Sequence, residues 1–176
     1  MRNLSTLAWR VYDAPTKPWH GVVADTEGDD SVYVMRVERR DGVSQLTLAH
    51  ITPTGTEELA VLEVASAPPH VPDVADFRLL ADGGSSVNHM PAICVIGSGG
   101  DIVLMPVDEE ASAPAEVVGS VDQGILAAAW SPEEDVLVLI TGGEKRLIVM
   151  TREFEVMSET MLSTEAFGDD QPVNCL

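Results

Sequence analysis

Hydrophobic positions in this chain fall into short runs, and Gly, Pro or acidic residues separate one run from the next. Runs of this length that are rich in β-branched residues and bounded by turn formers are typical of β-strands. No long stretch carries the apolar stripe of an amphipathic helix. The pattern predicts strands over residues 21–24, 31–37, 44–51, 58–64, 74–80, 91–96, 101–107, 115–121, 125–130, 136–141, 146–151 and 155–161.

The segment 125–130 is the one close rival for a helix, because its sequence ILAAAW contains three alanines. Pro132 and the turn around it limit any helix there, so a buried strand is the prediction. The connections between predicted strands are mostly short. Parallel strands need long crossovers, so the sequence predicts an all-β antiparallel meander.

Internal similarity sharpens the fold prediction. Residues 92–108 and 136–153 both read as an apolar strand, a Gly-containing turn and a second apolar strand, with Gly97 and Gly142 45 positions apart. Residues 22–38 form a weaker third copy. A period of about 40–45 residues with four strands per unit is the signature of WD40-type propeller blades.

The predicted fold is therefore an all-β, partial WD40-type β-propeller of about three antiparallel four-stranded blades. The blades are expected at roughly 19–64, 74–121 and 124–162, with the start of a truncated next blade at 163–176. A closed propeller has at least four blades, so the ring is expected to be open, with marginal stability and self-association through its edges.

The charge balance excludes some functions. With 10 Lys and Arg against 29 Asp and Glu, the formal net charge is −19, which argues against a nucleic-acid groove. The longest apolar runs are far too short to span a membrane, and the N-terminus lacks the apolar core of a secretory signal. Cys94 and Cys175 are predicted to be reduced thiols in an intracellular protein.

The turn Gly97–Ser98–Gly99–Gly100 invites comparison with a phosphate loop. A phosphate loop needs a following Lys-Ser/Thr pair and a helix, whereas Asp101 and a strand follow here. A nucleophile elbow around Ser98 fails as well, because residue 96 is Ile and the Gly-x-Ser-x-Gly pattern is broken. The prediction is a hairpin turn with no catalytic role.

Candidate metal ligands are scattered. The histidines and cysteines do not show the spacing of a zinc site, and His70 and His89 are expected to be solvated loop residues. The acidic pairs lack the alternating spacing of a calcium loop, and turn solubilisation explains them. The site prediction is therefore no catalytic, no cofactor-binding and no metal residue. The side chains considered are His20, His50, His70, His89, Asp29–Asp30, Glu109–Glu110, Glu133–Glu134 and Asp169–Asp170.

Large side chains are expected to pack the blades. Met35, Met105 and Met150 are predicted at equivalent blade positions, where core filling is favoured over a flexible interaction surface. Trp130 is expected to pack between blades. Trp9 and Trp19 flank the first strand and are expected to help close the ring in a longer protein.

Two stretches resemble a known family. Residues 1–4 (MRNL) and 119–159, followed by FGDDQPVN, resemble the N-terminal part of the largest Elongator subunit, the scaffold of the tRNA wobble-uridine (U34) modification complex. The match is most specific over 121–173. The resemblance implies the start of the first of two WD40 propellers. It also implies a non-catalytic scaffold, because the chemistry of the complex belongs to a different subunit.

The resemblance further implies partners and a location. The partners are other Elongator subunits, namely the catalytic subunit and the second WD40 subunit, with tRNA engaged only through the full complex. No membrane, small-molecule substrate or cofactor is expected, and the location is the cytoplasm or also the nucleus. The alternatives are an unrelated WD40 interaction module, a truncated product without independent function, and a small propeller hydrolase or lyase. The last would need convergent acid and base residues, which the sequence does not offer.

Overall fold

The computed structural model describes residues 21–24, 31–87, 89–107 and 114–163. Within them the chain is all-β, with one short 3₁₀ turn at Ser85–Val87. The strands are β1 (Gly21–Ala24), β2 (Val32–Arg40), β3 (Val43–Thr52), β4 (Gly55–Ala65), β5 (Val74–Leu80), β6 (Ala92–Gly97), β7 (Asp101–Pro106), β8 (Glu116–Ser120), β9 (Ile125–Trp130), β10 (Val136–Thr141), β11 (Arg146–Thr151) and β12 (Val156–Met161).

These strands form three four-stranded antiparallel sheets, each built from consecutive strands: the first sheet β1–β4, the second sheet β5–β8 and the third sheet β9–β12. Short hairpins explain this order. Between β2 and β3 the turn residues Asp41 and Gly42 have φ values of 48° and 85°. Positive φ at both central positions is the type I′ geometry that matches the twist of paired strands.

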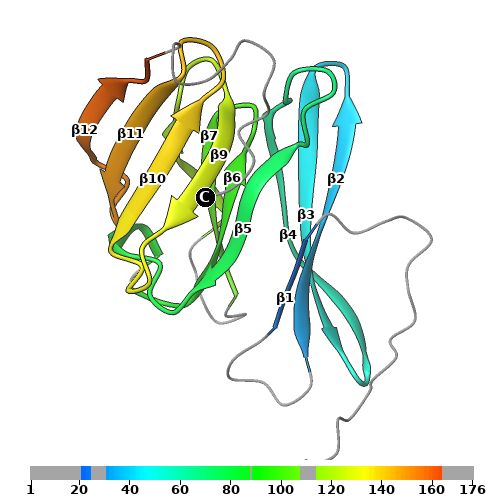
Figure 1. Ribbon diagram of the computed structural model, residues 1–176. Helices are drawn as coiled ribbons and strands as arrows, with labels where there is room; N and C mark the ends of the chain where they lie inside the picture. Colours follow the sequence, from blue (N-terminus) through cyan, green and yellow to red (C-terminus); the bar gives the residue numbers. More distant parts are fainter. Residues whose placement is uncertain (1–20, 25–30, 88, 108–113, 164–176) are drawn as a thin grey trace, which may run out of the picture.

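The sheets stack face to face like the blades of a fan (Figure 1). The second sheet stands between the first sheet on the right and the third sheet on the left. The strands β1, β5 and β9, which begin the three sheets, lie next to one another. This is the arrangement of propeller blades around an axis, and three blades do not complete the ring.

Two apolar cores hold the stack together. In the first seam, between the first and second sheets, Met35 and Leu48 pack against Val95 and Met105. In the second seam, between the second and third sheets, Leu104 and the residues around it pack against the apolar side chains of β10 and β11. Each of the two faces of the second sheet therefore buries its apolar side chains against a neighbouring sheet. This burial is the main contribution to the stability of the fold.

The predicted antiparallel strands and the predicted open set of about three four-stranded blades agree with this architecture, whereas the exact blade bounds stay a prediction. Residues 125–130 form strand β9, as predicted. The differences are local: β2, β3 and β4 are longer than expected because their hairpins are tight, and the 3₁₀ turn was not predicted. The expected start of a next blade at 163–176 lies almost entirely outside the described residues, as do Trp9 and Trp19. No helix among the described residues has the length and apolarity needed to cross a membrane.

Candidate functional site

The described residues hold no cluster of three or more His, Cys, Asp or Glu side chains suited to a metal ion. His70 is exposed in a loop. His89 is also exposed, and its Nδ1 lies 3.1 Å from Asp82 Oδ1. His50 stacks on the ring of Tyr33 in the first sheet, far along the chain from the other two. His20 and the acidic pairs at 29–30, 109–110 and 169–170 lie outside the described residues.

Two ionisable groups of the second sheet, the buried Cys94 and the half-buried Asp76, have perturbed pKa values. Cys94 is a free thiol with 0 % exposure, and burial raises its pKa well above the ordinary value. A buried protonated thiol is a poor nucleophile. Burial also raises the pKa of the Asp76 carboxyl, against an opposing effect of Arg78. Cys175 lies outside the described residues.

The glycine-rich turn is a structural junction. The Ser98 amide donates to Asp73 O over 2.9 Å, and Ser98 O accepts from the Ile125 amide at 3.1 Å. The turn of the second sheet thus bonds to the chain entering β5 and to the start of the third sheet. A Cβ on Gly99 would lie 2.1 Å from Ala65 O, and one on Gly100 would lie 2.2 Å from Val121 O. Glycine is required here because neighbouring backbone approaches closely. The predicted hairpin turn is confirmed.

Carboxylates tie the first seam at one end of β5. Asp73, just before β5, accepts hydrogen bonds from Arg39 at 2.6 Å and 3.1 Å and from Ser44 at 3.2 Å. Asp101, at the start of β7, accepts from the Ala65 amide at 2.8 Å and from Ser120 at 3.1 Å. We call this set the first clamp. It links one end of the first sheet, at the β2–β3 turn and the end of β4, to the second sheet.

A second clamp lies at the other end of β5 and ties the second seam. Asp82, after β5, accepts from the Gly84 amide at 2.8 Å and contacts Arg152 of the third sheet at 3.5 Å. Glu153 accepts from the Ser85 amide at 3.2 Å and from the Ser85 hydroxyl at 2.7 Å. Hydrogen bonds to these charged groups hold the pKa of Asp82 and of Glu153 below their ordinary values.

The sequence alone does not predict the two clamps. Asp73 and Asp82 bracket β5, but acidic residues next to strands usually serve as turn formers. Their role appears only when the blades are placed side by side. The sequence signal that could have found them is the position of one aspartate on each side of an inner strand.

The methionines are core residues, as predicted, with exposures of 0 %, 0 % and 4 % for Met35, Met105 and Met150. Their predicted equivalence is wrong for Met35. Met105 and Met150 lie on the third strands of their sheets, β7 and β11, whereas Met35 lies on a second strand, β2. The weak repeat over 22–38 is out of phase by one strand, because any apolar hairpin resembles another in sequence.

Trp130 packs in the second seam, as expected. It belongs to the core shared by the second and third sheets, and its ring meets Phe154 edge to face at a centroid distance of 6.0 Å. Such pairs add to the burial of apolar area. The tryptophan therefore helps fix the third sheet against the second.

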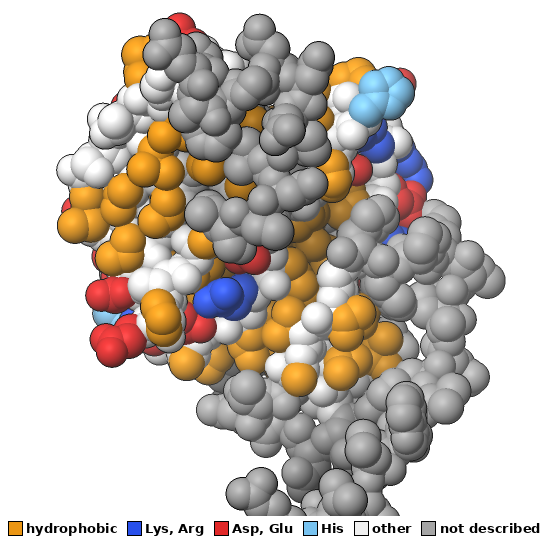
Figure 2. All heavy atoms as spheres, in the orientation of Figure 1, with side chains coloured by type: hydrophobic (Ala, Val, Ile, Leu, Met, Phe, Trp, Pro, Cys, Tyr) orange, Lys and Arg blue, Asp and Glu red, His pale blue; other side chains and the backbone are white. Residues whose placement is uncertain are grey.

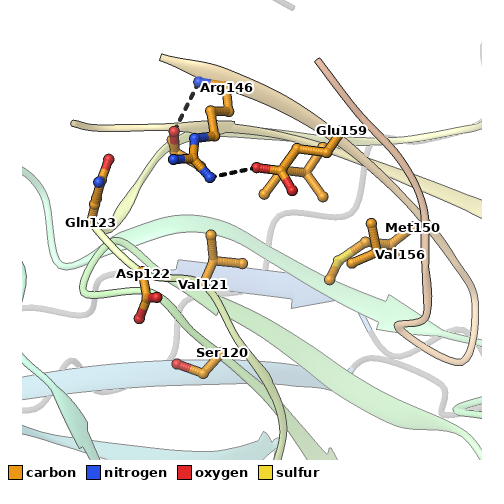
Figure 3. A pocket seen from close by; sticks show the side chains of 10 residues that line it. Ser120, Val121, Asp122, Gln123, Arg146, Met150, Val156 and Glu159 are labelled. Atoms are coloured by element: carbon orange, nitrogen blue, oxygen red, sulfur yellow. Dashed lines mark hydrogen bonds and ion pairs between the residues drawn. The ribbon is translucent and has the colours of Figure 1, made fainter. Parts of the chain in front are cut away.

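A groove remains open at the outer rim of the second seam (Figure 3). It has a volume of about 230 Å³. One wall is the link between β8 and β9, and the other is the face of β11 and β12 that turns toward the second sheet. We call it the rim groove; it is lined by Ser120, Val121, Asp122, Gln123, Thr141, Arg146, Ile148, Met150, Val156 and Glu159.

Arg146 is held at one end of the rim groove by carboxylates. Its Nη1 donates to Glu159 Oε1 at 2.7 Å, as Figure 3 shows, and its Nε donates to Glu144 Oε2 at 3.0 Å. These hydrogen bonds, that to Glu144 first, raise the pKa of the guanidinium further. The cation is therefore always charged and is already paired within the protein.

Comparisons with known proteins agree with the architecture. The family model described as the ELP1 first N-terminal beta-propeller matches residues 1–175. The Schizosaccharomyces pombe protein named Elongator complex protein 1 is 47 % identical over 73 residues, covering 41 % of this chain and 6 % of that protein. The Rattus norvegicus protein of the same name is 27 % identical over 180 residues, covering 96 % of this chain and 12 % of that protein.

The chain thus spans a small part of its relatives, 12 % of the rat protein's length. A solved chain titled Kluyveromyces lactis Hsv2 complete loop 6CD aligns with a TM-score of 0.29 and 9 % identity, over 72 % of this chain and 50 % of that chain, which is too weak to inform the fold. The stacked four-stranded blades and the match over residues 1–175 agree, and the chain belongs to the family of the ELP1 first N-terminal β-propeller.

Proposed function

We propose that this chain is a non-catalytic scaffold segment of the Elongator complex. Its role is to contribute blades to a larger propeller and to present rigid surfaces to other subunits. A different subunit of the complex carries out the catalysis. Family membership over residues 1–175 supports the assembly, and the curated relatives carry the name of the complex.

The observation that carries the scaffold role is the open face of the third sheet. On the side away from the second sheet, Ala129, Val138 and Val149 stand opposite one another in register and are only half-buried. Figure 2 shows hydrophobic side chains gathered over this sheet, on the left of the molecule. In a propeller such a face packs against the next blade, as the second sheet does on both of its sides.

The chemistry of the described residues supports a non-catalytic role. Four hydrogen-bonded carboxylates serve as ties between blades or between a blade and the following link, namely Asp73, Asp101, Asp82 and Glu153. The buried thiol of Cys94 has a raised pKa and is enclosed in the core. An active site would gather such groups around a space for substrate instead.

The finer assignments follow from the family. We propose that the partners are the catalytic subunit and the second WD40 subunit of Elongator. The chain would support modification of the tRNA wobble uridine (U34) by position only, consistent with its net charge of −19. The proposed location is the cytoplasm, with a nuclear pool as the alternative.

The test is purification of the protein from its own cells. The chain is tagged at the N-terminus at its native locus and purified gently, and its intact mass and co-purifying proteins are read by mass spectrometry. We expect Elongator subunits in the eluate. In a second strain, Val149→Asp places a charge on the open face and should reduce their recovery, whereas Val117→Asp, at an exposed position of β8, should not.

The outcomes separate the alternatives. If Val149→Asp lowers the recovery of Elongator subunits and Val117→Asp does not, the scaffold role is supported. A product of 18.8 kDa without Elongator subunits would overturn it and favour a truncated product without independent function. Recovery of a different, reproducible partner set would instead favour an unrelated WD40 interaction module.

A further inference from the structure

The outer rims of the two seams differ, although the blades are built alike. In the first seam the outermost strand β4 turns Leu62 and Val64 toward the second sheet, where they pack against its apolar residues. In the second seam the outermost strand β12 leaves Val156 and Met161 exposed at 56 % and 68 %. The place that β4 side chains fill in the first seam is the rim groove in the second.

The floor of the rim groove is apolar, and exposed apolar side chains border it. Ile148 and Met150 form the floor, with exposures of 7 % and 4 %. Val156, the register partner of Met150, stands beside it and is exposed (Figure 3). Exposed apolar side chains next to a concave site are typical of interaction surfaces.

The charges of the rim groove are predominantly negative. Asp122 and Glu159 line it, and Arg146 is the single lining cation. These three lining charges sum to −1, although Arg146 is hydrogen-bonded to Glu159. A partner that enters the groove with a cationic side chain would meet uncompensated negative charge.

The size of the groove limits the occupant. Sites for drug-sized molecules and cofactors usually enclose about 300–1,000 Å³. The rim groove, at about 230 Å³, has room for one or two side chains instead. Both of its walls border strands that end their sheets, β8 and β12, and such strands offer main-chain groups to an extended segment.

We propose that the rim groove binds a short extended segment of another protein, in which an apolar side chain and a Lys or Arg stand two positions apart and so share one face. The apolar side chain occupies the space over Met150 and Val156. The cation lies toward Asp122 and Glu159. This inference concerns a surface of the chain itself and does not depend on the assembly proposed above.

The experiment measures binding of a defined probe to the purified 176-residue chain. The probe is a fluorescein-labelled octapeptide in which leucine and arginine take turns at every second position with serine between them, so that both face the groove. Its binding is measured by fluorescence anisotropy. Its matched control has glutamate in place of arginine. We expect saturable binding of the basic probe and none of the acidic one.

Two pairs of variants test the site rather than the overall charge. Val156→Asp should weaken binding about tenfold, as expected when an apolar contact at the centre of an interface is lost, whereas Val61→Asp on β4 should have no effect. Glu159→Gln should weaken binding more than Glu63→Gln, an equal change of net charge on another sheet. Circular dichroism melts confirm that each variant is folded.

Three results would overturn the inference. Equal weakening by Glu159→Gln and Glu63→Gln would mean that the peptide is attracted by the overall charge only. Equal binding of the acidic probe would remove the charge argument. Concentration-dependent dimers in sedimentation, abolished by Val156→Asp but not by Val61→Asp, would show that a second copy fills the groove. Each result leaves the test of Elongator co-purification unaffected.

Discussion

The two seams of this molecule are made of the same parts and are closed differently. The first seam is apolar from the inner strands to the outer rim and is tied at the start of β5 by Asp73 and Asp101. The second seam is apolar at its centre, is tied at the far end of β5 through Asp82 and Glu153, and is open at the rim. Sheet geometry alone therefore does not decide how blades are joined; side chains at the ends and rims do.

The largest expected effect is a cavity in either seam. Leu48→Ala in the first seam and Leu137→Ala in the second each remove a fully buried side chain, so each should cost about 2–5 kcal/mol of the free energy of unfolding. Urea melts measure the cost, and hydrogen exchange locates it. Protection should fall in the first and second sheets for Leu48→Ala and in the second and third for Leu137→Ala.

The control for this pair is Leu126→Ala, which truncates a side chain that is 41 % exposed and should cost much less. If both core variants lost protection uniformly over all three sheets, the seams would not be separable units. The contrast between the first and second seams would then have no counterpart in stability.

A smaller effect is expected at the junction of the first seam. Gly99→Ala would place a Cβ 2.1 Å from Ala65 O, and the resulting backbone shift should cost about 1–3 kcal/mol. Gly55→Ala is the matched control, because a Cβ there meets nothing within 4 Å. Thermal melts of both variants measure the difference. Equal melting temperatures would show that the turn at Gly99 does not determine how the first two sheets join.

The smallest effect is the pH dependence of the second clamp. Glu153 has a folded-state pKa below its ordinary value of 4.5, so its contribution is complete above that value and is lost as the pH falls through the lowered pKa. The melting temperature of Glu153→Gln should lie below that of the parent chain at pH 7, and the gap should close below pH 4.5. Glu63→Gln on β4 should show no such closing gap; a constant gap for Glu153→Gln would contradict the clamp.

The strand pattern was predictable because each blade is a local meander. Several strands have the bounds that the sequence predicts, among them 74–80, 125–130, 136–141 and 146–151. Their apolar runs and turn residues determine structure over short distances in the chain. The phase of the weakest repeat was not predictable. Met35 lies on a second strand. Its predicted position is wrong because the apolar hairpin of β1 and β2 resembles, in sequence, a hairpin made of second and third strands.

The clamps and the rim groove could not be predicted for a different reason. Three carboxylates of the clamps each contact a residue far along the chain: Asp73 contacts Arg39, Asp82 contacts Arg152, and Glu153 contacts Ser85, which is 68 positions away. The groove exists because β12 leaves unfilled the place that β4 fills in the other seam. Both features depend on how whole blades stack, which no local pattern encodes.

The turn at Ser98 has a mechanical consequence. Its amide bonds to the chain entering β5, and its carbonyl bonds to the first residue of the third sheet. Both peptide units of this one residue are fixed by hydrogen bonds, so the β6–β7 turn acts as a strut that sets the distance between the chain entering β5 and the chain entering β9.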